Sequence, residues 1–87
     1  MKIKFSKKFS KQFDKLSKKI QKAFETKLNL FIKNKNNPFI NNHKLKGKFK
    51  GLSSINITGD YRAIFQELKN GEIIFFLMIG IHSKLYQ

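Results

Sequence analysis

The spacing of the apolar residues changes once along this chain, and that change constrains the fold more than any other feature. Between residues 6 and 34 they recur every three or four positions, at Phe9, Phe13, Leu16, Ile20, Phe24, Leu28 and Phe31. Such spacing places one apolar stripe along helical structure. From residue 53 onward, apolar residues alternate with polar ones, which is typical of strands. The sequence therefore predicts an α+β fold.

Two shorter features refine the N-terminal part of this prediction. Residues 2–5 alternate lysine with apolar side chains, which predicts a first strand with one face in solvent. Ser17 follows Leu16 in the middle of the helical segment, and serine is a favoured residue at the start of a helix. We therefore favour two helices that form a hairpin. One long helix is the alternative, because neither Gly nor Pro forces a break.

Turn signals divide the rest of the chain. Residues 34–42 contain five Asn and the only Pro, so this segment is the main connection. A Gly59-Asp60 turn separates the alternating runs 53–58 and 61–66, and a second turn at 69–71 precedes an apolar strand over 72–79. The expected structure is a single domain over residues 1–87. Its N-terminal strand and helical hairpin pack on a small antiparallel β-sheet.

Charge and composition narrow the possible functions. Lys and Arg total 19 against 5 acidic residues, a formal charge of +14 that a nucleic acid or an acidic protein would neutralise. Cysteine is absent and histidine occurs twice, so we expect no disulfide, no metal site and no cofactor. The longest apolar run is nine residues, well short of the ~20 that span a bilayer. We expect a cytoplasmic protein without membrane contact or a small-molecule ligand.

Four lysines recur at every second position, at Lys44, Lys46, Lys48 and Lys50. In extended chain this spacing places four ammonium groups on one side, with Leu45 and Phe49 on the other. The segment is interpreted as a cationic ribbon that contacts phosphates. A solvated edge strand, whose lysines discourage aggregation, is the alternative.

Arg62 is the only arginine beside 18 lysines. A planar guanidinium can hold two phosphate oxygens at once, which an ammonium group does less well. An ion pair with Asp60, two residues earlier, is an equally good interpretation of Arg62 alone.

His82 and Tyr86 follow the last strand, in GIHSKLYQ. A histidine can donate a proton near neutral pH, and a tyrosine can stack on a base or orient a phosphate. His43 precedes the lysines and could supply a second imidazole. For each residue taken alone, a surface or core role is the simpler interpretation.

The segments LKGKFKG, SINITGDYRAIF and MIGIHSKLY occur in this order. On these motifs the chain resembles the RelE/ParE superfamily of bacterial toxins, most closely its RelE, YoeB and YafQ mRNA-interferase branch. The resemblance spans nearly the whole chain and implies a RelE-like fold.

The resemblance also implies roles for single residues. His82 matches the catalytic acid, and Tyr86 matches an aromatic residue that contacts a base or orients the substrate. Arg62 matches the arginine that stabilises the scissile phosphate. His43 falls where a base or second proton handler is expected, and Asp60 matches an active-site aspartate.

Two positions depart from the YafQ-like pattern: Asn56 replaces a histidine and Met78 an arginine. The resemblance implies the toxin of a type II toxin–antitoxin system, a metal-independent endoribonuclease that cleaves mRNA on the ribosome through attack by the ribose 2′-hydroxyl. A cognate acidic antitoxin would be its regulator. The alternatives are a ParE-like toxin that inhibits DNA gyrase and cleaves nothing, and a non-catalytic module that binds RNA or the ribosome.

Overall fold

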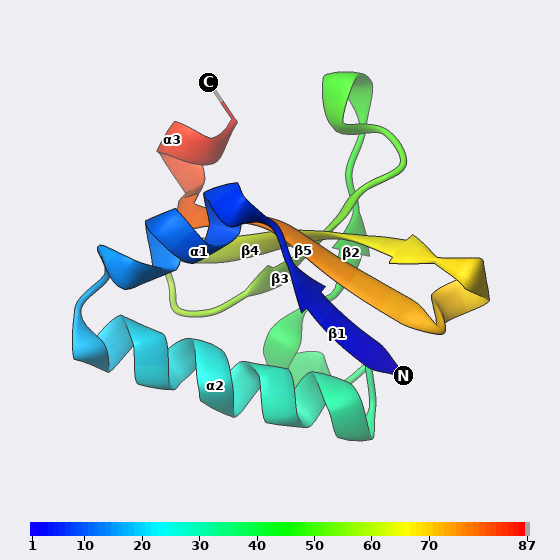
Figure 1. Cartoon of the computed structure of the whole chain (residues 1–87), viewed down its shortest axis with the longest axis horizontal. Helices are drawn as coiled ribbons and strands as arrows, with labels where there is room; N and C mark the ends of the chain where they lie inside the picture. Colours follow the sequence, from blue (N-terminus) through cyan, green and yellow to red (C-terminus); the bar gives the residue numbers. More distant parts are fainter. Residues whose placement is uncertain (87) are drawn as a thin grey trace.

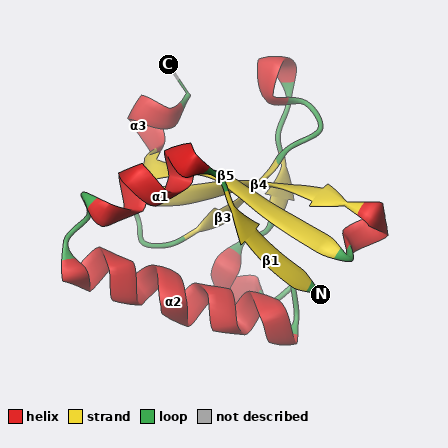
Figure 2. Ribbon diagram, in the orientation of Figure 1, coloured by secondary structure: helices red, strands yellow, loops and turns green. Residues whose placement is uncertain are grey.

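The computed structural model describes residues 1–86 and shows helices packed against a five-stranded sheet (Figures 1 and 2). The strand order across the sheet is β1-β5-β4-β3-β2. The strands are β1 (Lys2–Phe5), β2 (His43–Lys44), β3 (Ser53–Asn56), β4 (Tyr61–Leu68) and β5 (Ile73–Ile81). The helices are α1 (Lys7–Asp14), α2 (Lys18–Lys33) and α3 (His82–Leu85), with 3₁₀ turns η1 (Pro38–Ile40), η2 (Gly47–Phe49) and η3 (Lys69–Gly71).

Two serine caps define the helical hairpin. The Ser6 hydroxyl accepts a hydrogen bond from the Phe9 main-chain N–H at 2.9 Å and begins α1. The Ser17 hydroxyl accepts from the Ile20 N–H at 3.3 Å and begins α2. A capping side chain satisfies one of the first N–H groups of a helix, which have no partner inside it. The prediction of two helices with Ser17 as the second cap is confirmed.

The sheet is mixed, because its first strand runs parallel to its neighbour. β4 pairs antiparallel with both β3 and β5, as the turn signals predict. β1 lies at one edge and pairs in parallel with β5, with Lys2 opposite Ile73. β3 ends at Asn56, two residues earlier than the alternation suggests, because the Ile57 N–H donates to the Tyr61 carbonyl and closes the turn there. The predicted α+β class is confirmed. The predicted antiparallel pairing is found for β2 to β5 and is wrong for β1, whose pairing with β5 is parallel.

The main core lies between the helical hairpin and one face of the sheet. Phe76 is fully buried there, and its ring centroid lies 5.4 Å from that of Phe24 and 5.5 Å from that of Phe65. Figure 1 shows α2 along this face, with α3 and the loop between β2 and β3 on the other side of the sheet. The core consists of Phe9, Phe24, Phe31, Ile40, Ile55, Ile57, Ala63, Phe65, Ile74, Phe76 and Ile79. The opposite face is therefore left for the candidate site.

Side chains of the first helix and its cap close the edge of β5 where β1 ends. The Ser6 hydroxyl donates to the Leu77 carbonyl at 2.9 Å, and the Gln12 side-chain oxygen accepts from the Ile79 N–H at 2.9 Å. An exposed strand edge invites pairing with another chain, and these bonds remove two of its unpaired groups. The same bonds fix the C-terminal end of β5, from which α3 starts.

In the described part of the chain, no helix combines the length and the apolar character needed to cross a bilayer. Among residues 1–86, no three His, Asp or Glu side chains form a group that could hold a metal ion.

Ser54 provides a stability prediction. Its side chain is fully buried, and its hydroxyl has no hydrogen-bond partner within residues 1–86. Since a buried polar group without a partner is destabilising, we expect Ser54→Ala to raise the free energy of unfolding by about 1 kcal/mol. The melting temperature then rises by about 4–8 °C for a domain of this size. Thermal unfolding of the variant and of Ser53→Ala, a less buried neighbour, measures the effect; a lower melting temperature for Ser54→Ala contradicts it.

Candidate active site

The candidate acid lies where the last strand becomes a helix. β5 ends at Ile81 and α3 begins at His82, whose side chain is exposed. The His82 main-chain N–H donates to the Asp60 carbonyl at 2.8 Å. This bond joins the start of α3 to the turn between β3 and β4, so residues far apart in the sequence meet at one end of the sheet.

Gly80 lets α3 fold back over the sheet. A Cβ atom at this position would lie 3.3 Å from Cδ2 of Leu85, so a larger residue would push Leu85 away. Leu85 is buried, and Gly80 lies opposite Arg62 in the pairing of β4 and β5. Directly opposed residues point to the same face of a sheet. α3 is therefore held over the face that carries Arg62.

Tyr86 directly follows α3 and lies beside His82. The ring centroids of His82 and Tyr86 are 4.7 Å apart at an interplanar angle of 62°. Tyr86 is partly buried, and its ring also meets the ring of Phe49 edge to face, with the centroids 5.5 Å apart. The structure thus brings the predicted acid and the predicted aromatic residue into direct contact.

The Arg62 side chain braces the turn that precedes it. Its Nη1 donates to the carbonyls of Thr58, Gly59 and Tyr61 at 3.0–3.1 Å. Within residues 1–86 its Nη2 and Nε make no hydrogen bond, and no ion pair joins Arg62 to Asp60. The ion-pair interpretation of Arg62 is wrong. Two nitrogens of the guanidinium remain available for an anion such as a phosphate.

Asp60 is exposed and lies in the turn before β4. Its carbonyl holds His82, and its N–H donates to the Thr58 hydroxyl at 3.3 Å. No described residue pairs with its carboxylate. The structure therefore places Asp60 beside the start of α3, with a carboxylate that could accept a proton.

His43 lies on the same face of the sheet, on the outer strand β2. His43 pairs with Ser54 on β3, and Ser54 pairs with Ile64 on β4. Ile64 and Arg62 are two residues apart on β4, so their side chains lie on the same face of the sheet. The His43 Nδ1 is 2.8 Å from the Asn41 carbonyl oxygen. Because a carbonyl oxygen only accepts, this contact places the proton of the neutral ring on Nδ1 and leaves Nε2 as a proton acceptor.

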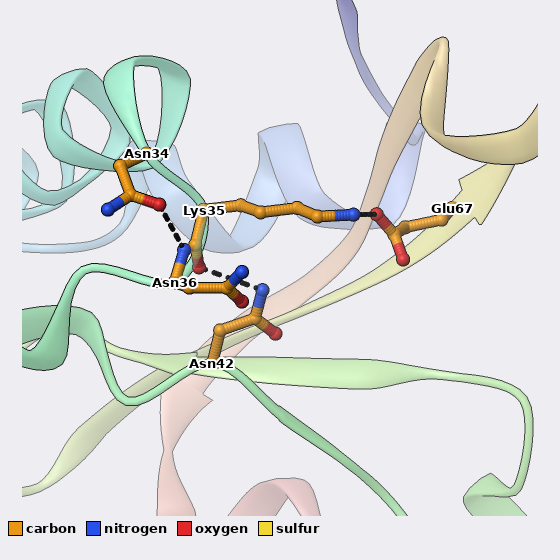
Figure 3. A network of polar contacts seen from close by, with 5 residues as sticks. All are labelled: Asn34, Lys35, Asn36, Asn42 and Glu67. Atoms are coloured by element: carbon orange, nitrogen blue, oxygen red, sulfur yellow. Dashed lines mark hydrogen bonds and ion pairs between the residues drawn. The ribbon is translucent and has the colours of Figure 1, made fainter.

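A polar network fixes the loop that leads to His43 (Figure 3). The Lys35 ammonium pairs with the Glu67 carboxylate on β4 at 3.0 Å, and the Asn42 side chain donates to the Lys35 carbonyl at 3.0 Å. Both charged side chains are partly exposed, so the ion pair stabilises the fold by no more than about 1 kcal/mol. The pair instead positions the loop, because it connects Asn42, the residue before His43, through Lys35 to Glu67 on β4, the middle strand of the sheet.

The four lysines do not form the predicted ribbon. β2 ends at Lys44, and the chain then makes the 3₁₀ turn η2, with Gly47 at φ +65° and Gly51 at φ +94°. These left-handed angles suit glycine and end the extended conformation on which strict alternation depends. We call residues 44–51 the basic loop; its lysines, Lys44, Lys46, Lys48 and Lys50, are all exposed.

The sequence predicted no site role for Phe49, placed Ser54 only in an alternating strand, and marked Asn56 only as a departure from the YafQ-like pattern. Phe49 contacts Tyr86, as described above. The Asn56 side-chain oxygen is buried without a partner within residues 1–86, directly opposite Arg62. A polar residue opposite the only arginine was the available signal for Asn56, whereas no sequence signal pairs Phe49 with Tyr86.

The fold that carries this arrangement is that of RelE-like toxins. YafQ from Escherichia coli strain BL21(DE3) has a TM-score of 0.81 to this chain at 20% identity, over 98% of this chain and 97% of that one. The YoeB/ParE toxin from Agrobacterium tumefaciens has a TM-score of 0.80 at 14% identity, over 94% and 99%. The RelB–RelE antitoxin–toxin complex from Methanococcus jannaschii gives 0.74 at 19%, over 95% and 94%.

The family model described as bacterial toxin of type II toxin-antitoxin system, YafQ, matches residues 1–87. The chain therefore belongs to the YafQ family and is the toxin of a type II toxin–antitoxin system. The resemblance inferred from the three sequence motifs is confirmed. No curated protein sequence matches the chain.

Proposed function

We propose that this toxin is an endoribonuclease that cleaves mRNA in the ribosome without a metal ion. The observation that carries the proposal is that His82, Tyr86 and Asp60 meet at one end of the sheet. At this end, two Arg62 nitrogens make no hydrogen bond within the described part of the chain. A proton donor, a proton acceptor and an anion-binding group on one surface are what cleavage of a phosphodiester by acid–base catalysis requires.

The reaction uses the hydroxyl that only RNA has. The ribose 2′-oxygen attacks the adjacent phosphorus, and its proton passes to His43 Nε2 or to the Asp60 carboxylate. The bond from phosphorus to the 5′-oxygen breaks, and His82 gives its proton to that oxygen. The products are a 2′,3′-cyclic phosphate and a 5′-hydroxyl. General acid–base assistance of this kind contributes about 10²–10⁴-fold.

The basic loop and Arg62 supply positive charge for the negatively charged phosphates of the RNA. Negative charge grows on the phosphate oxygens as the 2′-oxygen attacks, and a guanidinium with two uncommitted nitrogens can hold two of those oxygens. The exposed lysines of the basic loop bind phosphates along the strand, which raises affinity without reading sequence. Arg62 thus stabilises the transition state, and the lysines hold the RNA.

An acidic antitoxin would regulate this toxin by covering its cationic surface. The RelB–RelE structure with the same fold is an antitoxin–toxin complex. The formal charge of this chain is +14, and one ion pair, Lys35–Glu67, is formed within residues 1–86. A protein that covers the cationic surface must therefore carry many carboxylates.

A cleavage assay on ribosomes programmed with a defined mRNA tests the proposal. We expect cuts that leave a 2′,3′-cyclic phosphate and a 5′-hydroxyl, with or without a chelator. A message with a 2′-deoxy nucleotide at the cut position should remain intact there. Toxicity without any cleavage, together with inhibition of DNA gyrase, would contradict the proposal and support the ParE-like alternative.

The basic loop gives a salt prediction. Four phosphate contacts to single-stranded RNA give a slope of log K against log salt of about −2.8, at ~0.7 per contact. Replacing Lys46 and Lys50 with Gln should make the slope shallower by about 1.4. The rate at which the bound complex cleaves RNA should stay unchanged. Binding of an uncleavable 2′-O-methyl RNA measures the slope, and single-turnover cleavage measures the rate.

Lys22 and Lys33 provide the matched control, since both are exposed on α2, on the other side of the sheet. Replacing this pair with Gln removes the same charge and should change the slope less. Equal effects of the two double variants would show that net charge, and not the basic loop, determines binding.

A further inference from the structure

An aromatic row links the basic loop to the candidate acid. The ring of Phe49, on the basic loop, meets Tyr86 with centroids 5.5 Å apart and planes at 83°. Tyr86 in turn meets His82 at 4.7 Å and 62°. Both contacts have the edge-to-face geometry that aromatic pairs prefer. The loop that carries the lysines therefore touches the acid through one intervening ring.

The main chain around Phe49 holds its ring in a defined place. The Phe49 N–H donates to the Lys46 carbonyl, and the Lys50 N–H donates to the Gly47 carbonyl at 3.0 Å. The Leu52 N–H then donates to the Phe49 carbonyl, also at 3.0 Å. These three bonds make the tip of the basic loop a closed turn, so the main chain that carries the Phe49 ring has a defined course beside Tyr86.

The helix α3, by contrast, depends on contacts with other parts of the chain for its orientation. It has four residues, and no side chain caps its N-terminus. A helix this short is not stable alone, so its orientation depends on what it packs against. Leu85 packs over Gly80 on one side, and Tyr86 meets Phe49 at the C-terminal end. Phe49 and Gly80 thus both contribute contacts that orient the residues after His82.

We infer that Phe49 is a positioning residue, which holds the His82 imidazole in place through Tyr86 and so couples RNA binding by the basic loop to proton donation. The inference rests on the proposed nuclease function. When the loop lysines hold the RNA backbone, the row Phe49–Tyr86–His82 sets the acid at a fixed distance from that backbone. Misplacing a catalytic group by about 1 Å can cost up to ~10²-fold in rate.

Phe49→Leu tests the coupling, because it removes the ring and keeps an apolar side chain. We expect a fall of about tenfold in the single-turnover rate on programmed ribosomes, with affinity changed less than about twofold. Phe49→Tyr keeps the ring and should retain the wild-type rate. A full rate in Phe49→Leu, or an equal loss in both variants, overturns the inference.

Proton NMR of the isolated protein supplies a readout that does not depend on cleavage. The Tyr86 ring lies close enough to shift the ring protons of His82, so these signals should move in Phe49→Leu and stay in place in Phe49→Tyr. His43 contacts no aromatic ring within residues 1–86 and serves as the internal control.

The two measurements separate the possible failures. A lowered rate with unmoved His82 signals means that Phe49 acts on the RNA itself, which overturns the inference. A wild-type protein that cleaves nothing overturns the proposed function instead, whatever the NMR signals show. Moved His82 signals together with a lowered rate, both reversed in Phe49→Tyr, support the coupling.

Discussion

Replacing His82 with alanine should abolish measurable RNA cleavage and growth inhibition while the fold stays intact. The departing 5′-oxygen needs a proton, and loss of a general acid costs about 10²–10⁴-fold in rate. The fold should survive because the His82 side chain is exposed and its structural bond, to the Asp60 carbonyl, comes from the main chain. Single-turnover cleavage on programmed ribosomes and thermal unfolding measure the two effects.

A modified substrate shows whether His82 acts as the acid. If sulfur replaces the 5′-oxygen at the cut, the leaving thiolate needs no protonation. His82→Ala should then cleave this substrate nearly as fast as the wild type, whereas an Arg62 variant should remain slow. An equal defect of His82→Ala on both substrates would falsify the assignment of His82 as the acid. Full toxicity of a folded His82→Ala protein would favour the gyrase alternative.

The elements defined by local signals were predictable from the sequence. The spacing of apolar residues gave both helices, and Ser17 marked their boundary because a cap depends on its immediate neighbours. The hairpin between β3 and β4 followed from the Gly59-Asp60 turn and alternation on each side. These features depend mainly on residues that are close together in the sequence, so they can be predicted from one sequence alone.

The basic loop was not predictable in this way. Alternating lysines indicate an extended chain only if the main chain stays extended, and Gly47 and Gly51 at positive φ end that conformation. The parallel pairing of β1 with β5 also depends on packing between residues more than sixty positions apart. Period-two alternation predicts a strand and does not predict its neighbour or its direction.

Some features of the candidate site were also predictable from the sequence, and others were not. The motifs pointed to His82, Tyr86 and Arg62, and the structure places these residues at one end of the sheet. The motifs could not show that Arg62 braces its own turn through Nη1 or that Phe49 reaches Tyr86. Both features depend on how side chains are oriented in space, and the spacing of residues along the sequence does not determine that orientation.

Arg62→Lys should lower the cleavage rate more than tenfold, although the charge is kept. In the structure one guanidinium nitrogen holds the turn through three carbonyls, while Nη2 and Nε make no hydrogen bond to the described residues. An ammonium group has a single nitrogen, so it cannot brace the turn and also hold two phosphate oxygens. A tenfold loss corresponds to about 1.4 kcal/mol of transition-state stabilisation. Single-turnover cleavage at saturating ribosome concentration measures the loss.

Two further variants separate the two tasks of Arg62. Arg62→Gln removes the charge, and its amide nitrogen ends two bonds short of the Nη1 position that holds the turn. This variant should therefore unfold at a lower temperature than the wild type and cleave more slowly than Arg62→Lys. Thr58→Ala removes a hydroxyl that accepts bonds from Asp60 and Tyr61 in the same turn. It should loosen the turn and lower stability, with a smaller loss of rate than Arg62→Lys. A wild-type rate in Arg62→Lys would show that charge alone is needed at this position, since lysine supplies charge without the two-oxygen grip.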